Sequence, residues 1–160
     1  MPRILLSAVT AACLAAGVAQ ASACFTPEEM RAAQLRQLHV QLQVASLNCR
    51  TTDAELPAKY GSYVQRFGGA LNANARVLED HFARSHGKDH RRQMDRYVTQ
   101  LANEESQRAH VVADYCEDHA PLFDRILALK PAELEGFAVR LIPASGPACG
   151  GEKKAQTAKK

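Results

Sequence analysis

Four widely spaced cysteines limit the folds that this chain can adopt. Cys24, Cys49, Cys116 and Cys149 follow an apolar N-terminal segment, and their even number suits two disulfides in an oxidising compartment. No two of them form a C-x-x-C pair, the spacing that is typical of zinc ribbons, thioredoxin-like redox sites and c-type haem attachment. The sequence therefore predicts a domain closed by two covalent links between segments that lie far apart in the chain.

The chain begins with the features of a secretory signal peptide. Arg3 supplies a positive charge, an uncharged apolar stretch runs from Ile4 to Ala19, and Ala21-Ser22-Ala23 offers the small residues of a cleavage site. This stretch is shorter than the roughly 20 residues that span a bilayer. We therefore expect residues 1–23, with Cys13, to be cleaved off after Ala23. The mature chain would then have no transmembrane segment and would be periplasmic or secreted.

The rest of the chain divides into a domain at residues 24–149 and a tail at 150–160. The tail is rich in lysine and small residues, so we expect it to be disordered. Its lysines supply most of the formal net charge of +3, because acidic and basic residues nearly balance within the domain. The domain therefore lacks the charge pattern of a nucleic-acid-binding protein.

The first long helix is predicted to begin at Pro27. Thr26 suits the N-cap position and Glu29 the third helical position, where its side chain closes a capping box. An apolar seam then follows three- and four-residue steps, through Leu35, Leu38, Leu42, Ala45 and Cys49.

A second long helix is predicted from near Pro57 to Gly87. Gly87 suits a left-handed C-terminal cap, and Gly68-Gly69 in the middle indicates a kink or a close approach to another helix. The apolar stripe comprises Tyr60, Tyr63, Val64, Phe67, Leu71, Ala75, Leu78 and Phe82.

A third helix is predicted from an N-cap at Asp89 through Cys116. Two shorter helices are expected to start at Pro121 and Pro131, the second of them ending before Pro143. Few β-branched runs and no hairpin-turn dipeptides occur, so no strand is predicted.

Short connections between long helices favour antiparallel neighbours. The sequence therefore predicts an all-α fold, an up-down four-helix-bundle-like domain with a broken fourth helix. In that topology Cys49 and Cys116 lie at one end of the bundle, and the last helix returns Cys149 toward Cys24. Of the three possible pairings, only Cys49–Cys116 with Cys24–Cys149 joins neighbouring ends throughout.

One face of the third helix gathers polar side chains at helical spacing: Thr99, Asn103, Ser106 and His110. It is a candidate ligand-binding face, although a solvated helix face has the same pattern. Ser106 and His110 also give a hydrolase-like alternative, since they place a hydroxyl and a base four residues apart. No third residue that would orient His110 is identifiable, however.

Three histidines, His81, His86 and His90, surround the turn between the second and third helices and form a candidate metal site. Neutral imidazoles bind Zn, Cu or Ni. His81 and His86 would point about 140° apart on a continuous helix, so the site requires the helix to stop near Arg84, as Gly87 suggests. Basic residues are also favoured at a helix C-terminus by the helix dipole.

A longer pattern resembles a group of small exported helical proteins of Gram-negative bacteria that carry no assigned activity. The pattern covers about residues 35–116 and consists of Tyr63-Val64-Gln65-Arg66-Phe67, Leu71, Leu78, Phe82, Tyr97-Val98-Thr99, Ala102-Asn103, Ser106 and Cys116. This resemblance implies a helical secreted domain with Cys49 and Cys116 bridged, and it implies no activity.

No Gly-rich phosphate loop, G-x-S-x-G or H-E-x-x-H motif occurs, so an enzyme is the less favoured class and no cofactor is expected. The sequence favours a non-enzymatic binding or interaction protein of the cell envelope, with a protein or a small molecule as its partner. The alternatives are a periplasmic metal-binding protein and a hydrolase-like enzyme.

Overall fold

The computed structural model describes residues 24–149, and the predicted signal peptide and basic tail lie outside them. The described chain consists of α1 (Pro27–Asn48), α2 (Leu56–His86), η1 (Gly87–Asp89), α3 (His90–Val111), α4 (Tyr115–Leu127), η2 (Pro131–Glu133) and α5 (Leu134–Leu141). Within this range no strand forms, and a single β-bridge pairs Phe25 with Ala148. The predicted all-α, bundle-like fold is confirmed.

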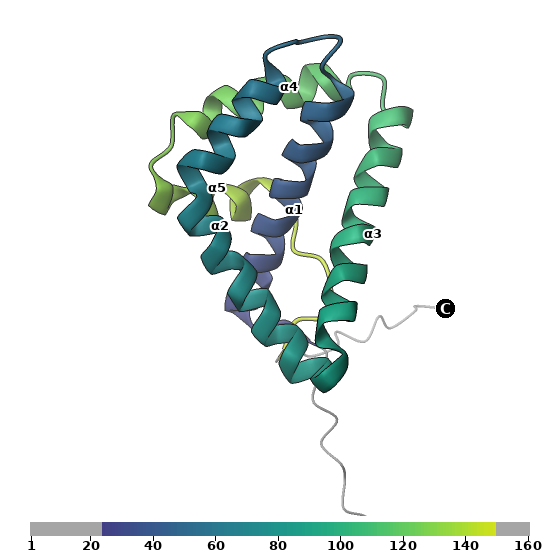
Figure 1. Ribbon diagram of the computed structural model, residues 1–160, viewed down its shortest axis with the longest axis vertical. Helices are drawn as coiled ribbons and strands as arrows, with labels where there is room; N and C mark the ends of the chain where they lie inside the picture. Colours follow the sequence, from purple (N-terminus) through teal and green to yellow (C-terminus); the bar gives the residue numbers. More distant parts are fainter. Residues whose placement is uncertain (1–23, 150–160) are drawn as a thin grey trace, which may run out of the picture.

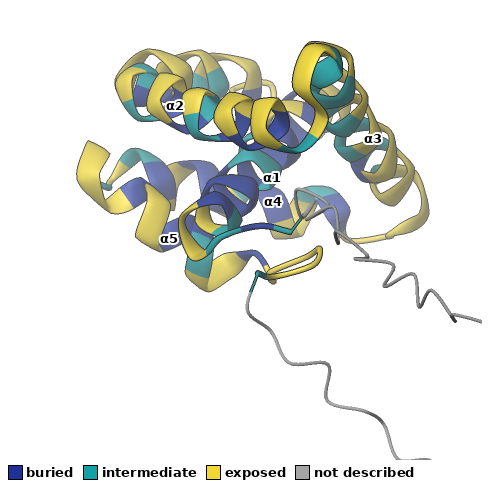
Figure 2. Cartoon of the chain, turned by 90° about the horizontal axis from the view of Figure 1, so that it is seen from below, coloured by how far each residue is buried: buried dark blue, intermediate teal, exposed yellow. Residues whose placement is uncertain are grey.

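Helices α1, α2 and α3 run in alternating directions (Figure 1). α2 and α3 meet at η1 and diverge toward their other ends, with α1 between them, while α4 and α5 form the broken return (Figure 1). α1 packs against all four other α-helices and is buried over much of its length, whereas α3 fully buries only Glu105 (Figure 2). The central position of α1 explains why its sequence is apolar on more than one side.

The predicted seam of α1 forms the centre of the main hydrophobic core. Leu38, Leu42, Ala45 and Cys49 are completely inaccessible to solvent. They pack with buried residues of α2, α4 and α5, including Leu56, Tyr63, Phe67, Tyr115, Phe123, Ile126, Leu134 and Phe137. A smaller cluster at the other end of α1 comprises Phe25, Ala32, Ala33 and Leu78. The helical period therefore predicted the core-facing residues of α1 and α2.

The predicted start of α1 and end of α2 are also confirmed. The Thr26 hydroxyl accepts a hydrogen bond from the Glu29 amide at 3.3 Å, and the Glu29 carboxylate accepts one from the Thr26 amide at 2.8 Å. Gly87 ends α2 at the predicted position with a φ of 54°, but its ψ of −125° lies outside the left-handed helical region predicted for this cap. Asp89 precedes α3 as predicted, but its carboxylate accepts from the side chains of Arg92 and Gln93 instead of capping the helix.

The close helix contact expected at Gly68-Gly69 is wrong. α2 runs through both glycines without a break, and in the described chain no neighbouring atom lies within 4 Å of where a Cβ would stand at either position. Gly69 is exposed and Gly68 is half-buried, so the two residues lie toward the solvent side of α2.

The predicted boundary between the third and fourth helices is wrong as well. α3 ends at Val111 because Val112 takes an extended conformation, and α4 begins at Tyr115, well before Pro121. The break lets Tyr115 enter the core while Cys116 reaches Cys49. Pro121 is tolerated inside α4 because it is exposed, as is Glu117, whose carbonyl loses the helical donor and can bind water instead.

Both predicted disulfides form, Cys24–Cys149 and Cys49–Cys116, with Cα atoms 5.0 and 5.4 Å apart. Two backbone hydrogen bonds support the terminal one: the Phe25 amide donates to the Pro147 carbonyl at 2.8 Å, and the Cys149 amide donates to the Phe25 carbonyl at 2.9 Å. Disulfides of this kind are typical of an oxidising, non-cytoplasmic compartment. None of the helices within residues 24–149 has the length and apolar character needed to cross a membrane.

Replacing Cys49 and Cys116 together by serine is expected to lower the free energy of unfolding by about 4 kcal/mol, because the bridge closes a long loop in the unfolded chain and Cys49 is buried. Although Cys24–Cys149 closes the longer loop, replacing it should cost less, since the Phe25–Ala148 bridge remains and chain ends can open locally. Urea unfolding of both double variants measures the difference, and the opposite ranking would contradict this assignment.

A buried polar cluster lies between α1 and α2. The rings of His39 and Tyr63 are 5.8 Å apart, and Arg36 lies one turn earlier on α1. Within the described residues Arg36 Nε, His39 Nδ1 and the Tyr63 hydroxyl are buried without hydrogen-bond partners. Burial, together with the positive charge of Arg36, lowers the pKa of His39 to about 4. His39 is therefore held neutral in the folded protein.

The stability of the protein is expected to fall as the pH drops from about 6.5 toward about 4, because unfolded His39 binds a proton that the folded protein excludes. The loss should reach about 3 kcal/mol at the acid end of this range. His39→Phe keeps a ring beside Tyr60 and Tyr63 but does not titrate, so it should flatten this part of the profile. Parallel urea unfolding of both proteins at several pH values tests this, and identical slopes would contradict it.

Candidate functional site

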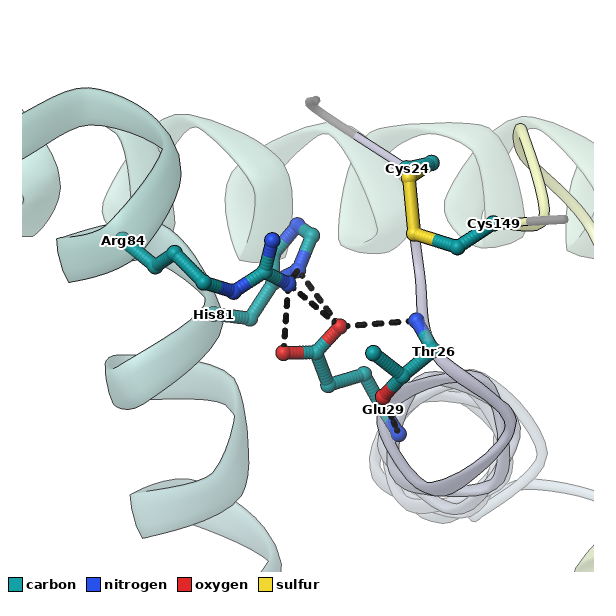
Figure 3. Close-up of a disulfide and its surroundings, with 6 residues drawn as sticks. All are labelled: Cys24, Thr26, Glu29, His81, Arg84 and Cys149. Carbon is teal, nitrogen blue, oxygen red and sulfur yellow. Dashed lines mark hydrogen bonds and ion pairs between the residues drawn. A yellow bond between two sulfur atoms is a disulfide. The ribbon is translucent and has the colours of Figure 1, made fainter. Parts of the chain in front are cut away.

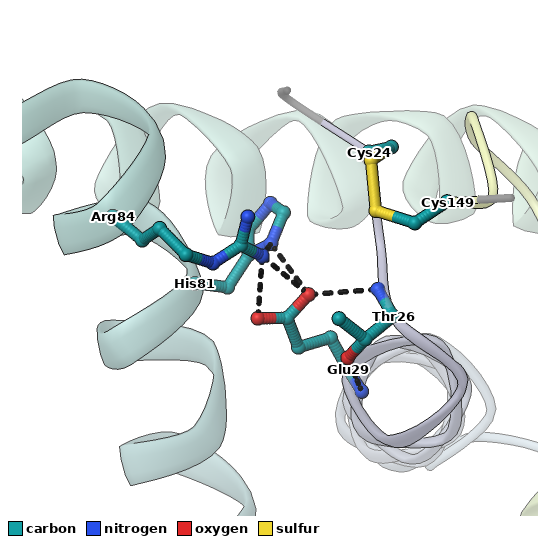
Figure 4. A network of polar contacts seen from close by, with 6 residues as sticks. All are labelled: Cys24, Thr26, Glu29, His81, Arg84 and Cys149. Atoms are coloured by element: carbon teal, nitrogen blue, oxygen red, sulfur yellow. Dashed lines mark hydrogen bonds and ion pairs between the residues drawn. A yellow bond between two sulfur atoms is a disulfide. The ribbon is translucent and has the colours of Figure 1, made fainter. Parts of the chain in front are cut away.

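A buried carboxylate joins the start of α1 to the end of α2. Glu29 is 8 % exposed, and both of its oxygens lie 2.7 Å from Nη2 of Arg84 (Figure 3). Oε2 also accepts the Thr26 amide and lies 3.1 Å from Nδ1 of His81, which therefore carries the ring proton. Figure 4 shows His81 and Arg84 converging on this carboxylate beside the Cys24–Cys149 disulfide.

These contacts hold Glu29 in its ionised form. Burial alone would raise the pKa of the carboxyl, but hydrogen bonds from Arg84, the Thr26 backbone and His81 outweigh that effect and lower it to about 2. The network is therefore a fixed negative charge with three donors, and it ties together two helices whose contacting residues are 52 and 55 positions apart.

An aromatic stack covers the network on the side of the chain termini. The ring of Phe25 lies on His81 with centroids 4.1 Å apart and an interplanar angle of 9°. The edge of Phe25 contacts Gly146, where a Cβ would come within 3.2 Å of the ring and the φ of 103° favours glycine. The ring of Phe82 meets His81 edge-on at 5.1 Å. The C-terminal segment, residues 142–149, is therefore fixed beside the network by the packing of Phe25 on Gly146 as well as by the Cys24–Cys149 disulfide.

A cavity of about 370 Å³ lies beside this stack, between the end of α2, the facing part of α3 and the segment Ser145–Gly146. Its walls are formed by aromatic and imidazole rings together with one leucine: Phe25, His81, Phe82, His86, Tyr97 and Leu101. Its remaining polar side chains come from Gln100, Glu104 and Ser145. We call this space the aromatic cavity.

The charge of the aromatic cavity is defined by one carboxylate. Among the described residues, Glu104 is the only acidic residue in the lining, and no lysine or arginine joins it. The Gln100 amide donates to Glu104 at 2.8 Å and so positions it. Burial raises the pKa of Tyr97 to about 12, so its hydroxyl stays protonated. Aromatic faces and a carboxylate both attract a cation.

The three histidines of the predicted metal site are not brought together as ligands. His81 binds Glu29, His86 stacks on Phe82 with centroids 5.8 Å apart, and His90 Nδ1 bonds the Gly87 carbonyl at 2.8 Å. Within residues 24–149 no group of three or more His, Cys, Asp or Glu side chains is placed to hold a metal ion. His81 and His86 instead contribute rings to the aromatic cavity.

The predicted polar face of α3 divides between two environments. Thr99 and Asn103 are exposed on an open groove along the outer side of α3, with Ser106 half-buried and His110 exposed outside that groove. Within the described residues no hydrogen bond joins Ser106 to His110. The pair therefore lacks the contact between nucleophile and base that a hydrolase-like site uses.

Sequence reasoning missed most of the residues that line the aromatic cavity. Phe82 belongs to the apolar stripe predicted for the second helix, Tyr97 was named only in the resemblance, and Glu104 lies one position beyond Asn103 of the predicted polar face. Glu29 was predicted only as a capping residue. Its bonds to His81 and Arg84 have no local signal, because they depend on how α2 crosses α1.

The Glu29–His81 pair resembles the half of a catalytic triad that orients a base. Ser145 lines the same cavity, but within residues 24–149 no hydrogen bond connects it to His81. Comparison with known proteins finds no matching family model, no matching curated protein and no matching solved structure.

Glu29→Gln is expected to lower the free energy of unfolding at neutral pH by about 3 kcal/mol, because Arg84 and His81 lose the carboxylate to which they donate hydrogen bonds. The wild-type protein should lose this contribution as the pH falls from about 4.5 to about 2, since the unfolded carboxyl binds a proton first. Urea unfolding at several pH values below neutrality measures both effects.

Glu28→Gln is the matched control, since Glu28 lies in the same first turn but is exposed and forms no salt bridge within the described residues. It should change stability by about 0.5 kcal/mol or less. Equal effects of the two substitutions would show that the network does not stabilise the fold.

Proposed function

We propose that this chain is a non-enzymatic binding protein of the periplasm or the extracellular space, and that it takes up a small organic cation in the aromatic cavity. The observation that carries the proposal is the combination of aromatic walls with a single carboxylate, Glu104, and without lysine or arginine in the described lining. A quaternary or primary ammonium group with a short apolar body fits these walls.

Pre-organisation supports binding at this place. Phe25 is fixed by its stack on His81, His81 is fixed by Glu29, and Glu29 is fixed by Arg84 and the Thr26 amide. A cavity whose walls are already ordered loses less conformational entropy when a ligand enters. Export of the protein is supported by the signal-like N-terminal segment and by the two disulfides.

Choline and 3,3-dimethylbutan-1-ol separate the effect of charge from the effect of shape, because the alcohol replaces the quaternary nitrogen by carbon. Choline is expected to bind at least about tenfold more tightly than the alcohol, as measured by NMR titration of the oxidised protein. Equal affinities, or shifts confined to residues outside the cavity, would contradict the cation assignment.

Glu104→Gln should weaken choline binding by about tenfold while leaving the fold intact, because the side chain is exposed at the cavity and keeps its shape. Glu117→Gln makes the same change at another exposed position, which does not line the aromatic cavity, and should leave choline affinity unchanged. A similar loss in both variants would show that choline responds only to overall charge.

A further inference from the structure

A second cavity lies on the other side of the C-terminal segment, between α1, α4 and residues 141–145. Its volume is about 510 Å³, and Ser145 lines both this space and the aromatic cavity. Its lining includes the apolar side chains of Leu122, Leu141 and Ile142. The lining also includes amide, imidazole and guanidinium groups and the carboxylate of Asp118. We call it the arginine cavity.

Gln41 is a mostly buried residue whose amide lines this cavity. It is 5 % exposed, lines the space, and forms no side-chain hydrogen bond within residues 24–149. Gln34, two turns earlier on the same face of α1, uses its amide to donate to the Ile142 carbonyl. The Gln41 amide therefore faces the cavity with its hydrogen-bonding groups available, so a ligand atom can take the place of water there.

The positive charge of the cavity comes from two arginines in different situations. Arg108 already has partners within the protein. Its Nη2 lies 3.3 Å from Nε2 of His119 and 3.5 Å from the buried carboxylate of Glu105. Arg125 is exposed, lies over the Phe137 ring at 5.2 Å, and forms no salt bridge with a carboxylate of the described chain. Arg125 is therefore the cation that a ligand can neutralise.

His119 adds a fixed polar group next to these arginines. Its Nδ1 donates to the Tyr115 carbonyl at 2.7 Å, and the Tyr115 hydroxyl donates to Glu105 at 2.7 Å. These hydrogen bonds and the Glu105 contact restrain Arg108, and none of them involves Arg125. Asp118 also lines the cavity, but among the described residues its carboxylate forms no salt bridge with Arg125.

We propose that the arginine cavity is a second binding site, which takes a carboxylate carried on a short aliphatic chain. Arg125 and the Gln41 amide would hold the carboxylate, and Leu122, Leu141 and Ile142 would cover the chain. The apolar wall favours this class over inorganic anions, which gain nothing from hydrocarbon contacts. The site is independent of the cation site, because the two cavities lie on opposite sides of the C-terminal segment and share only Ser145.

NMR titration of the full oxidised chain with hexanoate, hexylammonium and inorganic phosphate tests the assignment. Hexanoate should shift the resonances of residues 119–125 and 141–145, and phosphate and hexylammonium should bind at least about tenfold more weakly. Binding of hexanoate no tighter than about 10 mM, or equal binding of hexylammonium, would overturn the proposal.

Two substitutions then locate the contacts. Arg125→Gln should weaken hexanoate binding by about tenfold. Arg66→Gln is the matched control, because Arg66 is also exposed, lies over a phenylalanine ring at 5.8 Å and is outside the cavity. Equal affinities of the two variants would overturn the role of Arg125.

Gln41→Leu distinguishes binding from support of the fold. It should weaken hexanoate binding by about tenfold while changing the urea midpoint little, because the Gln41 side chain forms no hydrogen bond to another residue of the described protein. A fall in the urea midpoint with unchanged hexanoate affinity would show that Gln41 is structural and would overturn its place in the site.

Discussion

The ion pair of Glu29 with Arg84 holds together the part of the molecule on which the aromatic cavity depends. Glu29 caps α1, fixes the end of α2 and orients His81, and Phe25 stacks on that ring. A buried carboxylate is costly unless its hydrogen bonds are satisfied, and here an arginine, an imidazole and a backbone amide satisfy them. Glu29, which caps α1 locally, therefore also connects α1 to α2 and, through His81, to Phe25.

The unequal burial of the helices explains where cavities form. α1 is surrounded by the other helices, so its side chains are packed, whereas α3 buries only Glu105 fully and diverges from α2 (Figures 1 and 2). Space remains where α3 and the C-terminal segment approach the other helices incompletely. The segment at Ser145 then divides this space into an aromatic side with a carboxylate and an aliphatic side with two arginines.

The elements of the fold were largely predictable because their signals are local. The capping box at Thr26 and Glu29 and the seam through Leu38 and Leu42 lie within a few turns of sequence. The cysteine pairing followed once the helix directions were known. The end of α3 was mispredicted because the helical pattern continues through Tyr115, while the actual break depends on Cys116 reaching Cys49 in three dimensions.

The sequence by itself determined that this chain forms antiparallel helices, where most of them begin, and which faces are apolar. It also singled out His81 and His86, which line the aromatic cavity, although among the described residues they join no group of side chains placed to hold a metal ion. Only the tertiary structure decided that Glu29 meets Arg84, that Phe25 covers His81, and that the Gln41 amide lines a cavity. Helical periodicity specifies which side of a helix is buried, but it contains no information about which distant residue arrives there.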